Sequence, residues 1–383
     1  MKKQSAHHTP RTLFRLAALL LILCLLPTAA PAETAADETP TAAEASAAAE
    51  TTAAAEATAT AETPDGWVTF LLICNEGMNN SKGNAGNTLM VVAIQPDEGK
   101  IRLMMFTWDT FIEYEGYDVP QKLDMPYRNN GPEEAVKVFN ANFGLNIQHF
   151  MSLNYLNLAA LIDEYGGVTV DVTRAERNAL NGMVASKKIR LQEEVAGGMM
   201  SQTIVDMLAQ DYYLNDFGPD TRLNGLQAVG FGWLQYDSVY NCCERDAEVI
   251  ASLFHSVSAF ISEHIVFYTD ESGEPEHTEG RRTINLDHIT DDDYDYIHSL
   301  IVPFFQMSSH DLGEEEIRAI TISLAHIAYR ANLEGVDILD YLRYTVLPIE
   351  ATQPYDMVAG TKGHLVDKEA NIAFMQEFLY GDN

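Results

Sequence analysis

Three apolar runs stand out in the hydrophobic pattern of the chain between residues 66 and 106. Trp67 to Cys74 (WVTFLLIC) and Thr88 to Gln95 (TLMVVAIQ) are almost continuously apolar, which is the pattern of strands buried on both faces of a sheet. The turn residues Pro96-Asp97-Glu98-Gly99 separate the second run from a third, Lys100 to Phe106. The second and third runs are therefore predicted to form an antiparallel hairpin.

Helical patterns alternate with shorter strands in the rest of the chain. Pro132 to Phe143 has proline in its first turn, where a helix tolerates it, and Leu156 to Tyr165 is closed by Gly166-Gly167. Because strands and helices interleave, the predicted fold class is α/β, with a mixed central sheet flanked by helices on both faces. Further helices are predicted over 223–233, 245–261, 291–305 and 313–330, strands over 147–153 and 168–172, and a polar loop over 269–280.

Residues 1–32 have the pattern of a signal peptide. Basic residues without any acid precede the apolar run Leu16 to Leu26, and Ala30-Pro31-Ala32 follows as a small-x-small cleavage pattern. We therefore predict a cleaved signal peptide, a mature chain that starts at Glu33, and a location outside the cytoplasmic membrane. An uncleaved signal anchor is the alternative, although the apolar run is short for a membrane span.

Residues 33–65 form a separate segment rich in Ala, Thr and Glu. Its glutamates recur every six residues from Glu38 to Glu62, a spacing that does not keep one face of a helix. The segment offers no large apolar side chain to offset the entropy of ordering. We predict a disordered tether, followed by one folded domain over residues 66–383.

Composition and charge narrow the function classes. The chain contains 24 basic and 56 acidic residues, and its formal net charge is −32. Phosphate contacts need clustered Lys and Arg, so a general nucleic-acid binder is excluded. Four cysteines are too few for a disulfide scaffold. The adjacent pair Cys242-Cys243 favours free thiols because a bond between them would be strained; pairing of Cys74 with one of them is the alternative.

Common catalytic and metal motifs are missing from the sequence. It contains no GxSxG, HExxH, Walker A or GxGxxG pattern, and its 11 histidines are scattered without metal-ligand spacing. The acidic run Asp291 to Asp295 lacks the glycine and the distal glutamate of an EF-hand loop. We predict instead that this run begins a helix capped by Thr290.

Several segments, read in order, resemble the LytR-CpsA-Psr family, also called the cell envelope-related transcriptional attenuator domain. Leu161 to Val168 (LIDEYGGV) is close to a Leu-Val-Asp-x-Leu-Gly-Gly-Val motif of that family, and Leu223 to Ala228 (LNGLQA) matches its Leu-x-Gly-x-Gln-Ala. Weaker matches are Asn87-Thr88, Trp108 to Thr110, Lys122 to Tyr127, Asn130 to Glu133 and the tail Asn371 to Gly381. The resemblance covers the span from about Val68 to Gly381.

The resemblance implies a phosphotransferase that moves a glycopolymer from a polyprenyl-pyrophosphate carrier to peptidoglycan, near the outer face of the cytoplasmic membrane. The implied partners are a polyprenyl-linked lipid or cell-wall glycan, with Mg²⁺ as a candidate cofactor. Such chemistry needs Arg or Lys groups that bind the pyrophosphate, and an apolar cavity that takes the lipid tail.

The sequence departs from the family pattern where the anion would bind. Trp108 replaces an arginine before Asp109, and Trp233 and Gln235 replace an Arg-x-Arg pair. Arg245 is retained, but Asp246 replaces the glutamine beside it. The predicted site residues are Asp109 and Arg245 as catalytic groups, Lys122, Trp108, Trp233 and Thr88 as substrate-binding groups, and Glu76 as a metal ligand.

Each of these residues also has a structural alternative. Asp109 could cap a turn, and Arg245 could pair with Glu244 or Glu248. Lys122 could lie on the surface, and both tryptophans could be apolar residues that pack against the core. We expect a pocket floored by Trp67–Cys74 and Lys100–Phe106 and flanked by the helix Leu223–Trp233.

Three hypotheses follow from these departures. The favoured one is a family member that binds or regulates, with weak or lost catalysis, because the motif arginines are mostly absent. The alternatives are an active, divergent phosphotransferase and an unrelated extracellular protein.

Overall fold

The structure is a computed structural model. It describes residues 66–75, 85–96, 99–183, 185, 213–276, 278, 280–336, 338–349, 355–358, 360–366 and 368–381. The predicted signal peptide, the predicted tether and Glu76 lie outside the described residues.

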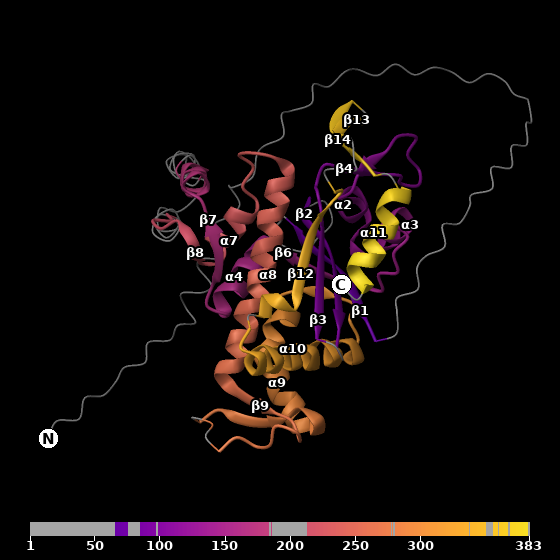
Figure 1. Cartoon of the computed structure of the whole chain (residues 1–383). Helices are drawn as coiled ribbons and strands as arrows, with labels where there is room; N and C mark the ends of the chain where they lie inside the picture. Colours follow the sequence, from indigo (N-terminus) through magenta and orange to yellow (C-terminus); the bar gives the residue numbers. More distant parts are fainter. Residues whose placement is uncertain are drawn as a thin grey trace, which may run out of the picture.

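A mixed sheet of six strands forms the centre of the molecule (Figure 1). β1, β3, β6 and β12 run parallel to one another, and β2 and β11 run antiparallel to them. The predicted hairpin is confirmed, because β2 pairs with β3 in an antiparallel register. The strand order is β11 (Ser309–His310), β6 (His149–Asn154), β1 (Val68–Asn75), β2 (Gly86–Gln95), β3 (Lys100–Phe106) and β12 (Leu342–Leu347).

The central strands are continuously apolar because both of their faces are covered. Along β1, Leu72 and Cys74 belong to one hydrophobic cluster, and Leu71 and Ile73 belong to another on the opposite face. The predicted α/β class, with helices on both faces, is therefore confirmed (Figure 1). The first face is covered by α4 (Tyr155–Glu164), α8 (Val239–His264), α9 (Asp291–Gln306) and α10 (Glu314–Glu334), and the second by α2 (Met125–Asn130), α3 (Pro132–Phe143) and α11 (Lys368–Tyr380).

Two glycine motifs allow α4 to pack closely against α7 (Gly225–Gly232). A Cβ atom on Gly225 would lie 1.8 Å from the carbonyl oxygen of Ala159. Gly167 has a φ of +99°, and its Cβ atom would lie 2.5 Å from the carbonyl oxygen of Leu223. Asp163 Oδ1 accepts a hydrogen bond of 2.7 Å from the backbone N–H of Gly225. The segments LIDEYGGV and LNGLQA are thus two halves of one contact.

Smaller sheets surround the central one. β7 (Val168–Val172) pairs with β8 (Gly218–Leu223), and β9 (Ile265–Tyr268) pairs with β10 (Arg282–Asn285). A four-stranded sheet joins β13 (Tyr355–Val358), β14 (Thr361–Leu365), β4 (Thr110–Ile112) and β5 (Gln121–Lys122). Short 3₁₀ turns occupy Leu286–His288 and Ile338–Asp340.

The helix boundaries correct the sequence analysis at two places. α8 begins at Val239 instead of residue 245, because the Ser238 hydroxyl caps it by accepting from the backbone N–H of Asn241 at 3.0 Å. Residue 223, predicted to start a helix, is the last residue of β8.

Two further sequence predictions are confirmed. Thr290 caps α9 in a capping box with Asp293, as expected for the acidic run. Cys74, Cys242 and Cys243 are free and buried, so the alternative of a bond to Cys74 is wrong. Within the described residues, no helix combines the length and the apolar character that a membrane span requires.

Candidate functional site

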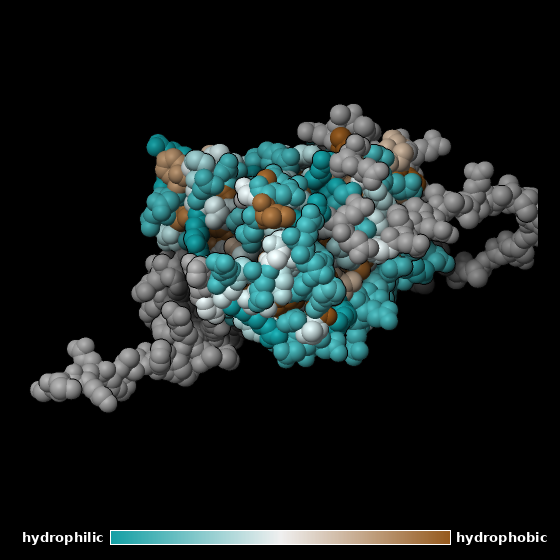
Figure 2. All heavy atoms as spheres, turned by 60° about the horizontal axis from the view of Figure 1, so that its bottom comes forward, coloured by the Kyte–Doolittle hydropathy of each residue, from teal (hydrophilic) through white to brown (hydrophobic). Residues whose placement is uncertain are grey.

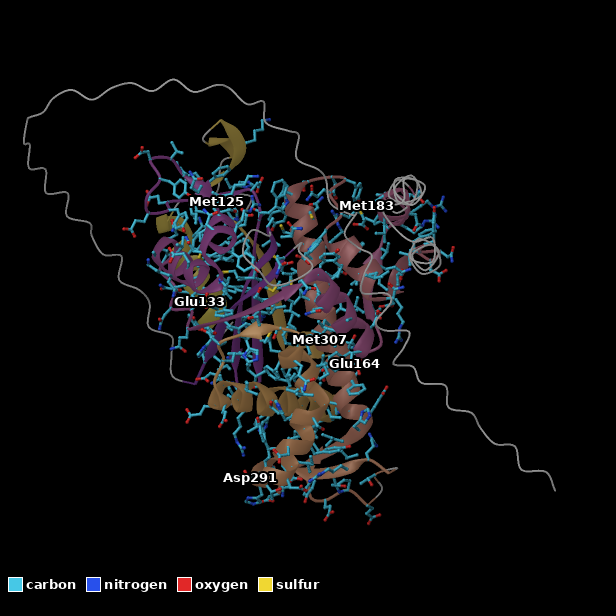
Figure 3. The ribbon with its side chains drawn as sticks, turned by 180° about the vertical axis from the view of Figure 1, so that it is seen from behind. Met125, Glu133, Glu164, Met183, Asp291 and Met307 are labelled. Carbon is cyan, nitrogen blue, oxygen red and sulfur yellow. The ribbon has the colours of Figure 1, made fainter. Side chains whose placement is uncertain are left out.

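The sequence-predicted residues gather at one edge of the central sheet, where β1, β3, β6 and β12 all end. This edge is at the top of Figure 1, beside the start of α8. The carboxyl ends of parallel strands commonly carry ligand sites in α/β proteins. Figure 3 gives the orientation from behind, with Met125 of α2 near this end and Asp291 of α9 at the other.

A polar cluster of the buried Thr88 and Asp246 with the partly buried Trp233 lies at this edge. The Thr88 hydroxyl donates to Asp246 Oδ2 at 2.5 Å. The indole N–H of Trp233 donates to Thr88 Oγ1 at 3.4 Å. Burial raises the pKa of Asp246 to about 6, although its bonds with Thr88 and Trp233 act in the opposite direction. Thr88 and Trp233 were predicted as ligand-binding residues, and the structure places them side by side.

A small apolar cavity lies in the core on the first face of the sheet. Cys74, which lines the cavity, is the β1 partner of Thr88 in the sheet register. The cavity has a volume of about 50 Å³ and is lined by apolar side chains from β1, β2, β6, α4, α8, α9 and α10. This cavity is lined by β1, but not by β3 or by the helix over 223–233, so the expected pocket stays a prediction. On the same face of the sheet, α8 packs directly on β3.

Arg245 is held inside the protein by acidic partners. Its two terminal nitrogens form hydrogen bonds of 2.9 Å each with the two carboxylate oxygens of Asp237. Nη1 also lies 3.4 Å from Glu176 Oε1, and Nη2 donates to the carbonyl oxygen of Leu234. The side chain is only 5% exposed. The bond from Arg245 lowers the pKa of Asp237, as expected for a closed ion pair.

Asp109 lies beside a histidine from a distant part of the chain. His364 Nδ1 is 3.2 Å from Asp109 Oδ1, and the backbone N–H of His364 donates to the Asp109 carbonyl at 3.0 Å. Asp109 is 1% exposed, and its Oδ2 has no hydrogen-bond partner. The contact forms because β14 pairs with β4. Sequence reasoning missed His364, since no local pattern distinguishes it from the other scattered histidines.

Lys122 and Trp108 form a further pair near Asp109. The Lys122 ammonium lies 5.2 Å from the centre of the Trp108 ring, within the range of a cation–π contact. The Trp108 indole nitrogen is buried without a hydrogen-bond partner. The predicted substrate-binding residues Lys122 and Trp108 therefore contact each other, and both lie at the edge that carries Thr88 and Trp233.

The described acids do not form a metal site. Within the residues that the structure describes, no group of three or more His, Cys, Asp and Glu side chains could hold a metal ion. Asp109 is bonded to His364 and Asp246 to Thr88. A Mg²⁺ site that uses Glu76 stays a prediction, because Glu76 lies outside the described residues.

Comparison with known proteins identifies the family. The LytR_cpsA_psr family model matches residues 34–260, which is more than half of the chain, and the chain belongs to this family. Among curated proteins it is similar to the polyisoprenyl-teichoic acid–peptidoglycan teichoic acid transferase TagU of Halalkalibacterium halodurans, with 24% identity over 96 residues. The match covers 25% of this chain and 32% of TagU, so the chain matches about a third of that relative's length.

Solved structures show the same fold. The crystal structure of B. subtilis TagV matches with a TM-score of 0.51 and 13% identity, covering 83% of this chain and 98% of TagV. TagT bound to LIIa-WTA matches with a TM-score of 0.50 and 10% identity, covering 84% of this chain and 93% of TagT. The family and the fold expected from the sequence motifs are confirmed.

Proposed function

We propose that this protein is an exported cell-envelope protein that binds a polyprenyl-linked lipid or cell-wall glycan during glycopolymer assembly, with weak or lost catalysis. The relative TagU is a polyisoprenyl-teichoic acid–peptidoglycan teichoic acid transferase. Family membership supports a related role here. Thr88 and Trp233 offer polar groups for the head group of such a ligand, and the small apolar cavity lined by Cys74, the sheet partner of Thr88, is the proposed start of its tail site.

The observation that carries weak or lost catalysis is the environment of Arg245. Its guanidinium is bonded to Asp237, Glu176 and the Leu234 carbonyl, so it has few donors left for a pyrophosphate. Asp246 adds a further buried carboxylate at the same edge. Loss of one preorganised donor typically costs about 2.7–4 kcal/mol of transition-state stabilisation, which favours binding over efficient transfer.

The test compares three ligands on the full chain: a neutral polyprenol, a polyprenyl monophosphate and a polyprenyl pyrophosphate. We expect the first two to bind at least as tightly as the pyrophosphate, with little dependence on Mg²⁺. Leu253→Trp, which fills the apolar cavity, should weaken the binding of all three ligands. Leu333→Trp on the exposed surface is the matched control and should leave their binding unchanged. Mg²⁺-dependent release of polyprenyl phosphate from a glycan-linked carrier would contradict the proposal.

Export is tested separately by the mass of the protein recovered from the producing cells. A mature chain that starts at Glu33 is the expected result. Recovery of an intact chain from Met1 would favour the signal anchor instead.

A second candidate function, active phosphotransfer, is favoured by the contact between Asp109 and His364. An imidazole oriented by a buried carboxylate can act as a general base. Here it would take the proton of an acceptor hydroxyl as that oxygen attacks the phosphorus and polyprenyl phosphate leaves. If this candidate holds, Asp109→Asn and His364→Asn should each abolish release of polyprenyl phosphate, while Leu333→Trp should leave release unchanged.

A further inference from the structure

We propose that the end of the molecule opposite the candidate site binds a saccharide chain that carries one anionic group between neutral sugars. Two hollows lie there, of about 700 Å³ and about 430 Å³. They share three lining residues, Ser262, Arg281 and Asn332. The two hollows therefore meet at Arg281 and offer an elongated surface suited to a chain-like ligand.

Arg281 keeps its charge available because its bonds go to backbone carbonyls. Nε donates to the carbonyl oxygen of Thr278 at 3.1 Å, and Nη1 donates to that of Ser262 at 3.3 Å. In the described part of the chain, no carboxylate forms an ion pair with Arg281. Its neighbour Arg282 is different, because it contacts Asp292 and Asp293 at 2.7 and 2.8 Å. The net charge of the chain is −32. An arginine that is held in place by carbonyl oxygens and has no carboxylate partner is suited to bind an anionic ligand.

The remaining lining supplies groups that recognise sugars. Asn332 Nδ2 donates to Ser262 Oγ at 3.1 Å, so an amide and a hydroxyl lie beside Arg281. Tyr268 and Tyr329 line the smaller hollow, where aromatic rings can contact the apolar face of a sugar. Figure 2 brings this end forward and shows a mostly hydrophilic surface with separate hydrophobic areas. Such a mixture fits a saccharide better than an acyl chain.

The acids that flank Arg281 restrict the spacing of charge on the ligand. Glu263 lines the larger hollow and Glu274 the smaller one. Their carboxylates can accept from sugar hydroxyl groups, but they repel a closely spaced polyanion. The preferred ligand therefore places its anion at Arg281 and neutral sugars on both sides.

The site lies apart from the residues on which the proposed function rests. It is built from α8, β9, the loop after β9 and α10, at the bottom of Figure 1, whereas Thr88, Trp233 and Asp246 lie at the opposite edge. A glycan held at one end would leave the apolar cavity and the polar cluster open to a second ligand.

The experiment measures binding of three probes to the full chain by titration calorimetry. The probes are soluble peptidoglycan fragments freed of their stem peptides, in which alternate sugars carry a free carboxylate, neutral chitooligosaccharides, and an oligomer of glycerol phosphate. We expect the peptidoglycan fragments to bind at least about tenfold more tightly than the other two. Equal binding of the neutral probe, tighter binding of the glycerol phosphate oligomer, or no binding of the fragments would overturn the proposal.

Two variants locate the binding at Arg281. Arg281→Gln should lower the affinity for the peptidoglycan fragments at least about tenfold. The control Arg318→Gln removes the same charge from an exposed position on α10 and should bind the fragments as wild type does. Asn332→Asp, which keeps the side-chain size and places a negative charge beside Arg281, is the second variant if Arg281→Gln does not fold. Unchanged affinity in both Arg281→Gln and Asn332→Asp would overturn the proposal. Polyprenol binding should be unchanged in these variants, which separates this result from the test of the proposed function.

Discussion

At the residue scale, the buried carboxylate of Asp246 links the candidate site to the stability of the protein. Its pKa is about 6 in the folded protein against an ordinary value of 3.8. Between about pH 4 and pH 6 the folded state therefore binds more protons at this group than the unfolded state does. The free energy of unfolding accordingly falls as pH rises through this window. Above pH 6, where Asp246 is ionised in both states, its burial lowers the free energy of unfolding by about 3 kcal/mol.

The corresponding variant is Asp246→Asn, which keeps the shape and can still bond with Thr88. We expect it to be more stable than wild type at pH 7.5, by up to about 3 kcal/mol, and the advantage should disappear near pH 4. Urea unfolding across this range checks the expectation. The neighbouring thiols do not interfere, because burial raises the pKa of Cys74, Cys242 and Cys243 above this range. A difference independent of pH would contradict the assignment.

Arg245 is expected to behave as a structural residue. Its removal would leave Asp237 and Glu176, with side chains 23% and 12% exposed, without their cation. We expect Arg245→Gln to cost about 3 kcal/mol of unfolding free energy. Arg245→Lys should recover only part of this, because an ammonium cannot make the two parallel bonds to Asp237. If urea unfolding shows Arg245→Gln to be as stable as wild type, the arginine is free to bind ligand.

The sequence allowed part of this site to be predicted. Thr88, Trp108, Asp109 and Trp233 could be named because each lies near a family motif that local sequence reveals. His364 could not, because its contact with Asp109 joins residues 255 positions apart. The partners of Arg245 were missed for a related reason, since Glu176 belongs to the helical residues 174–183 and no sequence spacing connects it to α8.

At the element scale, the contact between α4 and α7 depends on the absence of a side chain. Gly225→Ala would place its Cβ atom 1.8 Å from the Ala159 carbonyl oxygen, so the two helices must separate. We expect a loss of at least about 3 kcal/mol, comparable to the severe overpacking of a core. Thermal unfolding measures it. Gly273→Ala is a control for a glycine with no atom near its Cβ position, although its φ of +74° adds some strain. Equal effects of the two changes would contradict the close packing.

Burial on both faces explains which strands of the central sheet could be predicted from the sequence. β1, β2 and β3 were predicted because most of their residues are apolar and buried, with few polar exceptions such as Thr69 and Arg102. β12 was not predicted, because it lies at the edge of the sheet and alternates poorly: Arg343 and Tyr344 are exposed, whereas Leu342, Val346 and Leu347 are buried. Its place beside β3 is set by pairing across the sheet, which no local pattern reveals.

At the scale of the whole molecule, the two hydrophobic clusters show which part of the described chain contributes to the core. Among the described residues, the buried members of both clusters lie between Val68 and Leu379, and the division of the chain at residue 66 stays a prediction. Strands from residue 68 onward pair with partners as distant as Leu347 through the shared sheet. The described core therefore requires almost the whole segment after residue 66.

Deletion of residues 1–65 tests this division of the chain. Since the clusters draw on residues from Val68 onward, we expect the shortened protein to fold and its unfolding free energy to change by less than about 0.5 kcal/mol. Thermal unfolding of the two proteins in the same buffer makes the comparison. Deletion of residues 1–72 is the contrasting variant, because it removes Phe70 and Leu72 from the first cluster and Leu71 from the second. We expect that variant not to fold, because the central strand β1 loses five of its eight register pairs with β2 and three of its six with β6. A large loss of stability from the shorter deletion would show that residues before Gly66 contribute to the folded domain.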